Sequence, residues 1–234
     1  MFTADWLDVI FVHFRIAPKK LAPLVPLPLD CLRGDAYVSL VAFTQSRLRP
    51  TVGGRLGELL AAPLAHHEFL NVRTYVRHGD ARGIFFMTEW IPNRLAAFVG
   101  PRTYGLPYRL GRLTYRGMRR DIAAAAGRLT FEASPSHAAA AAAPADPLDD
   151  FLLERYTAFT HRSGVTQRFD VEHEPWPQRR TEVKLIETSL LAQSGPWLRD
   201  AELGGSHYSP GVRDVIIGRP RRVLPASLRR RARA

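Results

Sequence analysis

The chain has 234 residues, of which 46% are hydrophobic and 10% aromatic, enough to bury a substantial core in one large domain. No uncharged run approaches the ~18 apolar residues that a membrane span needs. Asp5 and Asp8 near the start argue against a secretory signal, and the single cysteine, Cys31, excludes an internal disulfide or a thiolate metal cluster. The sequence therefore predicts a cytoplasmic protein without a transmembrane segment.

The net charge of +11 is concentrated at the C-terminus. Residues 219–234 carry seven arginines and no acidic residue, and subtracting those seven leaves +4 on the remainder. We predict a single domain over residues 1–218 and a flexible Arg-rich tail over 219–234. Such a tail binds anionic surfaces or RNA without specificity. Because no recognition motif accompanies the charge, we expect no specific nucleic-acid partner.

Alternating residues predict a strand over 6–16. The alternation assigns its side chains to two faces, Trp6, Ile10, Val12, Phe14 and Ile16 on one, and Val9, Phe11, His13 and Arg15 on the other. Pro18 opens a short helix that Pro26 and Pro28 end. Residues 36–44 are apolar on both faces, as in a strand covered on both sides.

The next segment, 49–64, predicts a loop with a short helix. From His67 the chain alternates again, with Leu70, Val72 and Val76 on one face and Asn71, Arg73, Tyr75 and Arg77 on the other. Residues 78–83 have turn chemistry, and GIFFMTEWI (83–91) predicts the returning strand of a hairpin. A short helix over 93–99 is expected to end at the Gly-Pro break at 100 and 101.

The second half predicts two short strands near 112–115 and 128–132, and a linker at the alanine run 138–143. A helix begins at Pro147 with Asp146 as its cap, and its buried stripe is expected to comprise Leu148, Phe151, Leu152, Tyr156 and Phe159. Residues 168–173 and 179–188 predict another hairpin. Many short strands with few helices favour an antiparallel sheet or barrel.

Seven motifs in this order carry a family resemblance: VHFRIAPKKLAPLVP, EFLNVRTYV, GIFF, YGLPYRL, FLLERY, VEHEPWP and HYSPGV. From about residue 6 to about residue 218, the chain resembles the DUF2071 (YqjF-like) family, which is similar in fold to acetoacetate decarboxylase. The resemblance implies an α+β fold that is mainly antiparallel β. A bent sheet is expected to close into a cone-like barrel around an internal cavity, with a few peripheral helices.

The same resemblance suggests a site from which the reactive amine is missing. The enzyme family's GFPKKLA turn looks like GLPYRLG here, so Tyr108 stands at the Schiff-base lysine and Arg109 at its neighbour. The family's pocket arginine and glutamate look like Arg15 and Glu68. An imine mechanism needs a neutral lysine amine. The chain's lysines are Lys19 and Lys20 at a helix start, and Lys184 on a strand face that is predicted to meet solvent, so we do not expect decarboxylation through an imine.

Tyr108 and Glu68 remain candidates for proton transfer, and Arg15, Arg109, Arg73 and His13 for substrate binding. The alternative is that these arginines and the glutamate pair structurally inside the barrel. We expect Tyr75 and Tyr104 to be core aromatics.

His66, His67 and Glu68 are adjacent, so their side chains point to opposite faces and predict no metal site. Without a GxSxG elbow, a phosphate loop or a dinucleotide fingerprint, no cofactor is expected. Two classes stay open: an enzyme acting on a small organic acid or ketone, or a non-catalytic ligand-binding or scaffold protein with a filled barrel. The oligomeric state, including a homo-oligomer, is also open.

Overall fold

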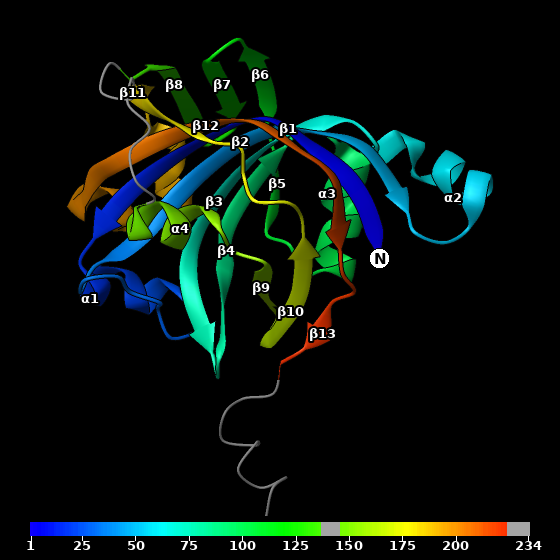
Figure 1. Ribbon diagram of the computed structural model, residues 1–234, viewed down its shortest axis with the longest axis horizontal. Helices are drawn as coiled ribbons and strands as arrows, with labels where there is room; N and C mark the ends of the chain where they lie inside the picture. Colours follow the sequence, from blue (N-terminus) through cyan, green and yellow to red (C-terminus); the bar gives the residue numbers. More distant parts are fainter. Residues whose placement is uncertain (137–145, 224–234) are drawn as a thin grey trace, which may run out of the picture.

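The computed structural model describes residues 1–136 and 146–223. Their strands form one bent sheet (Figure 1). In chain order the strands are β1 (Phe2–Ile16), β2 (Ala36–Pro50), β3 (His67–His78), β4 (Ala81–Ile91), β5 (Tyr108–Leu110), β6 (Arg112–Arg116), β7 (Arg119–Ala124), β8 (Gly127–Pro135), β9 (Thr157–Arg162), β10 (Val165–Glu172), β11 (Arg179–Glu187), β12 (Ala201–Ile217) and β13 (Arg221–Arg222).

Neighbouring strands follow the order β13-β10-β9-β4-β3-β2-β1-β12-β11-β8-β7-β6, with β5 beside β4. An additional pairing of β10 with β12 closes the part of this order from β10 to β12 into a ring. The pairings are antiparallel except for those of β4 with β5 and with β9. This mainly antiparallel, cone-like sheet confirms the predicted fold class.

The helices are short and peripheral. They are α1 (Pro18–Leu21), α2 (Gly54–Ala61), α3 (Arg94–Thr103) and α4 (Pro147–Leu153), with 3-10 turns at Ala22–Leu24, Ala62–Leu64, Ser189–Ser194 and Pro196–Asp200. None of the described helices is long and apolar enough to cross a membrane.

Alternation along the central strands builds two apolar cores. Ile10 and Val12 of β1 pack in one, on the side of the sheet where the 3-10 turns at 189–200 lie. Val9 and Phe11 pack in the other, on the concave side of the ring. β2 is buried along both faces from residue 36 to 43, which confirms the prediction for that strand.

Trp6 lies on the face opposite to the predicted one. It packs with the concave-side core, against Phe43 and Trp176 with ring centroids 5.5 and 6.3 Å away. The cause is an irregularity in β1, where Asp8 has a left-handed φ of 55° and the register against β2 shifts between Leu7 and Ile10. Because such a bulge inserts an extra residue, the side chains before it point to the faces opposite to those that the alternation after it predicts.

Two helix boundaries also differ from expectation. α3 continues past Gly100 to Thr103, because Pro101 falls in the last turn, where its missing N–H removes only one helical hydrogen bond. α4 is capped by Asp146 as predicted but ends at Leu153. Tyr156 is consequently exposed, and Phe159 is buried in β9 rather than on a helix.

The predicted hairpin of 168–173 with 179–188 is wrong. β10 pairs with β9, β12 and β13, whereas β11 pairs with β8 and β12. Between them the buried Trp176 packs against Phe11, with ring centroids 5.2 Å apart, and separates the two strands. The sequence prediction also missed five strands, β5, β7, β9, β12 and β13. The alanine run and residues 224–234 of the predicted tail lie outside the described residues.

Candidate functional site

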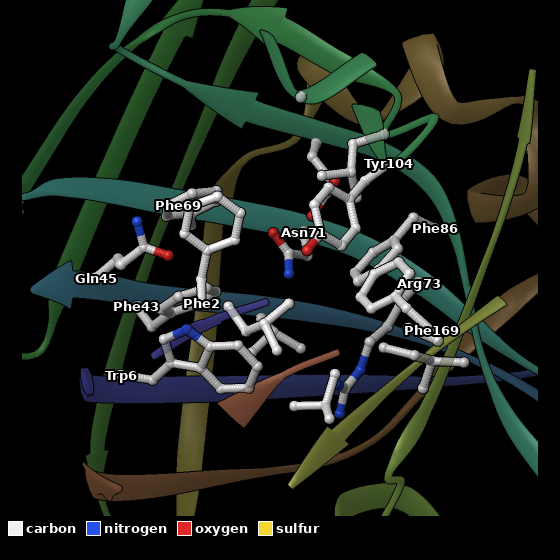
Figure 2. A pocket seen from close by; sticks show the side chains of 18 of the residues that line it. Phe2, Trp6, Phe43, Gln45, Phe69, Asn71, Arg73, Phe86, Tyr104 and Phe169 are labelled. Atoms are coloured by element: carbon white, nitrogen blue, oxygen red, sulfur yellow. The ribbon is translucent and has the colours of Figure 1, made fainter. Parts of the chain in front are cut away.

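A cavity of about 200 Å³ lies on the concave side of the ring (Figure 2). Its walls come from β2, β3, β4 and β10, from α3, and from the first residues of β1. They are mostly aromatic and aliphatic, including Phe2, Trp6, Phe43, Phe69, Phe86 and Phe169. Polar side chains are few, so each of them has a large effect on what the cavity can bind.

Three of these polar side chains form a row across neighbouring strands. Asn71 of β3 pairs in register with Glu89 of β4, which pairs in turn with Tyr108 of β5. All three line the cavity. Among the described residues, no hydrogen-bond partner meets Asn71 Oδ1 or Glu89 Oε2, so both oxygens are available to a ligand.

Burial favours the neutral forms of both Glu89 and Tyr108. Burial raises the pKa of Glu89, which is 2% exposed, well above its usual value. Burial also raises the pKa of Tyr108, and the nearby Glu89 and Tyr104 add to that effect. A neutral carboxylic acid and a phenol are hydrogen-bond donors, so this wall of the cavity offers donors to an oxygen atom.

Arg73 supplies a buried positive charge. It is 8% exposed, and its guanidinium lies 5.7 Å from the centre of the Phe11 ring. Its Nη2 donates a long 3.4 Å hydrogen bond to the Leu152 carbonyl, and its Nε has no partner among the described residues. None of the ion pairs in the described chain includes Arg73, although burial, which lowers its pKa, opposes a charge here.

Arg155, which also lines the cavity, is a buried arginine whose positive charge is balanced by a buried carboxylate. Its Nη1 donates to Asp30 at 2.8 Å, and Asp30 also accepts from Arg77 at 2.6 Å and Arg82 at 2.8 Å. Burial of Asp30 opposes ionisation, but the three arginines hold its pKa below the usual value. This cluster therefore has ion-pair partners, whereas Arg73 has only the Tyr75 hydroxyl and the charge of Glu154 to favour its charged form.

His67 is a further polar group of the cavity wall. Neither ring nitrogen has a hydrogen-bond partner among the described residues. Burial, with a smaller contribution from His66, lowers the pKa of His67 to about 4. It is therefore neutral at neutral pH, with one of its ring nitrogens unprotonated.

Of the six residues predicted for the site, Tyr108 and Arg73 line this cavity. Arg15 is half exposed and pairs with Glu202 and Asp35. Arg109 is exposed and donates to Gln193 at 3.1 Å. Glu68 does not line the cavity either, since it shares its strand face with Leu70 and Val72, which pack in the opposite core.

Lys184 is exposed, as predicted. Lys19 and Lys20 are also absent from the cavity wall, so none of the three lysines faces it. The described residues hold no cluster of three metal-ligating side chains.

His13, the sixth predicted residue, lies in a buried chain of polar side chains outside the cavity wall. Its Nδ1 is 2.7 Å from Ser39 Oγ and its Nε2 is 3.1 Å from His207 Nδ1. Ser39 Oγ lies 2.6 Å from Tyr75 Oη, and the Tyr75 hydroxyl donates to the Leu152 carbonyl at 2.8 Å. At the other end, His207 Nε2 is 3.1 Å from Asp149 Oδ1 of α4.

Sequence reasoning missed Glu89. The available signal was a lone carboxylate in GIFFMTEWI, a strand whose other side chains carry no charge. Such a residue is unlike a solvated surface glutamate, because both of its strand neighbours are apolar or small.

Comparison with known proteins places the chain in a family. The model of DUF2071, an uncharacterized conserved protein family, matches residues 3–213. The chain belongs to this family. The uncharacterized protein YqjF of Bacillus subtilis (strain 168) is 29% identical over 206 residues, which cover 84% of this chain and 83% of YqjF.

Solved structures share the fold of this DUF2071 protein at low identity. An acetoacetate decarboxylase-like enzyme from Sphingomonas wittichii RW1 has a TM-score of 0.63 and 18% identity, over 95% of this chain and 92% of that one. An acetoacetate decarboxylase has a TM-score of 0.57 and 13% identity, over 95% and 89% of the two chains. The family and fold predicted from the sequence motifs are thus confirmed.

Proposed function

We propose that this DUF2071 protein binds a small organic acid carrying a carbonyl group. In this proposal the carboxylate meets Arg73, and the carbonyl oxygen accepts hydrogen bonds from the two donors of the row, Glu89 and Tyr108. The observation that carries it is the buried guanidinium of Arg73, which has no ion-pair partner in the described chain. An arginine presents paired N–H donors that match a carboxylate, and a bound carboxylate would supply the missing counter-charge.

The size and lining of the cavity favour a small ligand. About 200 Å³ accommodates a few heavy atoms, and the aromatic walls exclude water around them. A structure of the enduracididine biosynthesis enzyme MppR, which shares this fold with a TM-score of 0.62 at 11% identity, is a complex with pyruvate. That ligand is of the size and chemistry that the cavity suits, and it is a suitable probe.

Binding is tested by thermal shift and calorimetry with pyruvate, acetate and acetone. We expect pyruvate to raise the melting temperature most, because it alone carries both groups. Arg73→Met should abolish the effect of pyruvate and acetate, whereas Arg15→Met, which removes an exposed arginine outside the cavity, should leave it intact. Equal shifts in both variants, or no shift with any acid in the wild type, would overturn the proposal.

An enzymatic role is a second candidate, and His67 is the observation that favours it. A neutral imidazole, with one ring nitrogen unprotonated, lines the same cavity as Glu89 and Tyr108, whose neutral forms are favoured by burial. Donors on a carbonyl oxygen together with a base are the groups that remove a proton next to that carbonyl.

The two candidates differ in a measurable proton exchange. Incubation of pyruvate in D₂O with an enzyme of this kind would deuterate the methyl group faster than buffer does, and Glu89→Gln and Tyr108→Phe would slow that exchange. Binding without accelerated exchange assigns the cavity to a binding protein. Because no lysine faces the cavity, borohydride treatment with pyruvate should trap no adduct in either case.

A further inference from the structure

The cavity wall has a second polar row, at the end away from Arg73. Trp6 of β1 pairs in register with Gln45 of β2, which pairs in turn with His67 of β3, and all three line the cavity. Trp6 Nε1 and both ring nitrogens of His67 have no hydrogen-bond partner among the described residues. The amide of Gln45 donates a long 3.4 Å hydrogen bond to the Leu64 carbonyl. Buried polar atoms without partners are uncommon, so this row, hereafter the far row, indicates a place for a polar group of the ligand.

Between the far row and Asn71, the cavity wall is aromatic. Phe43 and Phe69 pair in register across β2 and β3, and their rings stack with centroids 5.0 Å apart and planes 5° apart. The Trp6 ring lies 5.5 Å from that of Phe43, and the His67 ring lies 4.6 Å from that of Phe69. Because aromatic rings prefer to pack against other rings, this stretch of wall suits an aromatic segment of a ligand.

Strand β3 sets the order of these groups along the cavity. Alternate residues of a strand point to the same face. Four successive positions on the concave face of β3 all line the cavity: His67, Phe69, Asn71 and Arg73. Figure 2 shows Asn71 between Phe69 and Arg73. A ligand with its carboxylate at Arg73 and its carbonyl group level with Asn71 therefore points its remaining atoms toward Phe69 and the far row.

The cavity has room for an aromatic ring in that direction. Its volume of about 200 Å³ exceeds the roughly 150 Å³ that hold a benzene ring in an apolar protein cavity. Pyruvate has one methyl group beyond its carbonyl, so it would leave the aromatic stretch and the far row unoccupied.

The hydrogen-bonding groups of the far row match a hydroxyl group. The indole of Trp6 is a donor only, whereas a neutral imidazole such as that of His67 has one donor and one acceptor nitrogen. A hydroxyl group both accepts and donates, so it can accept from Trp6 and donate to His67 at the same time. A second carboxylate suits the far row less well, because none of the three side chains is a cation.

We propose that the ligand is an oxo acid with a hydroxylated aromatic ring beyond its carbonyl group. The ring packs against Phe43 and Phe69, and the ring hydroxyl binds Trp6 and His67. For the acid end of the ligand, this inference rests on the proposed binding of a carboxylate at Arg73, whereas the far row is independent of it.

The ligand class is tested by calorimetry with pyruvate, phenylpyruvate and 4-hydroxyphenylpyruvate. We expect phenylpyruvate to bind at least about tenfold more tightly than pyruvate, because each buried carbon tightens binding about fourfold. The ring hydroxyl should add roughly another tenfold through its hydrogen bonds. Binding of 4-hydroxyphenylpyruvate that is no tighter than that of phenylpyruvate would overturn the proposal.

The role of the far row is tested by the preference for 4-hydroxyphenylpyruvate over phenylpyruvate within each variant. His67→Phe keeps a ring and removes both nitrogens, so the preference should fall to about one. Trp6→Phe removes one donor and should lower the preference in part, and it serves as the test if His67→Phe does not fold. His161→Phe, at an exposed histidine outside the cavity wall, should keep the full preference. A full preference in both cavity variants would contradict the assignment.

Two further probes, 4-methylphenol and toluene, separate this inference from the proposed function, because neither carries a carboxylate. If 4-methylphenol binds more tightly than toluene while pyruvate does not bind, the proposed function fails and the far row stands as a hydroxyl site. If pyruvate binds but the ring hydroxyl adds no affinity, the further inference is wrong and the proposed function stands.

Discussion

At the scale of one residue, Glu89 makes the stability of the fold depend on pH. Its carboxyl group is nearly fully buried, and one oxygen has no partner among the described residues. Burial raises its pKa, so the folded chain keeps the proton while the unfolded chain releases it above its ordinary pKa. The stability that Glu89 contributes is complete below that ordinary pKa and falls as the pH rises toward the raised one.

Glu89→Gln should therefore stabilise the protein more at high pH than at low pH. Glutamine has nearly the same shape and no proton to lose, so the melting temperature should rise at about pH 8 and change little at about pH 4. Thermal unfolding followed by circular dichroism measures this. Glu68→Gln, at a half-buried position outside the cavity, is the control; an equal effect of Glu89→Gln at both pH values would contradict the assignment.

Part of the site was predictable from single residues. Strand alternation separated Asn71 and Arg73 from Leu70 and Val72, and the family resemblance led to Tyr108. The same alternation puts Glu68 on the wrong face, but the resemblance outweighed it. The place of Glu89 in the site could not be predicted in this way. It depends on the register of β3, β4 and β5, which is set by contacts between distant parts of the chain.

At the scale of elements, Gly83 allows β4 to lie against β9. A Cβ atom at this position would be 2.4 Å from the Thr157 carbonyl oxygen and 2.9 Å from the Phe159 ring. These two residues belong to β9, which pairs with β4 in parallel from Ile84 onward. This close approach joins the two halves of the ring.

Gly83→Ala should consequently separate the two strands at a cost of about 2 kcal/mol, within the range for overpacking a tight contact. Urea unfolding measures the loss of free energy. Gly204→Ala is the matched control, because its added Cβ would have no neighbour nearer than 3.5 Å. Equal stability of the two variants would show that β4 and β9 can shift apart without cost.

The elements themselves were predictable to different degrees. Strands with regular alternation, such as β3 and β4, were found with nearly correct bounds. Local departures from these patterns were not predicted, because they arise from the tertiary structure. The left-handed backbone of Asp8 moves Trp6 to the opposite face of β1. Arg155 binds Asp30 at a point where the sequence predicted that the helix continues. The partners of β10 and β11 also lie far away in sequence.

At the scale of the whole molecule, Asp30 ties distant segments together. It is fully buried and accepts from Arg77 of β3, Arg82 of β4 and Arg155, which follows α4. Asp30→Asn would leave these guanidinium groups without their anion. Since Arg155 is itself buried, we expect a loss of about 3 kcal/mol in urea unfolding. Asp121→Asn, which affects an exposed pair with Arg119, should cost much less.

The overall architecture was the most predictable level, since composition, many short strands and motif order all indicate one antiparallel fold. The pH dependence of the whole molecule was not, because it depends on burial. His67 and His13 are neutral in the fold, with pKa values lowered by burial, while their unfolded forms take up protons near the ordinary value. Their contributions are present above that value and are lost as the pH falls, which is opposite in sign to the contribution of Glu89.

His67→Gln isolates one of these contributions. Between about pH 7 and pH 5 the folded His67 stays neutral, since its pKa is about 4, while the unfolded residue becomes charged. The wild type should then lose about 2 kcal/mol relative to His67→Gln over this interval, from about 1.4 kcal/mol per pH unit below the ordinary pKa. Urea unfolding at several pH values measures the difference, with the exposed His161→Gln as control.

Combining His67→Gln with Glu89→Gln should leave a pH dependence of stability that is set by His13 and the remaining buried groups. The two substitutions change the stability in opposite directions, and their effects add unless the two side chains interact across the cavity. A double variant whose pH dependence departs from the sum of the single ones would therefore measure the coupling between His67 and Glu89 directly.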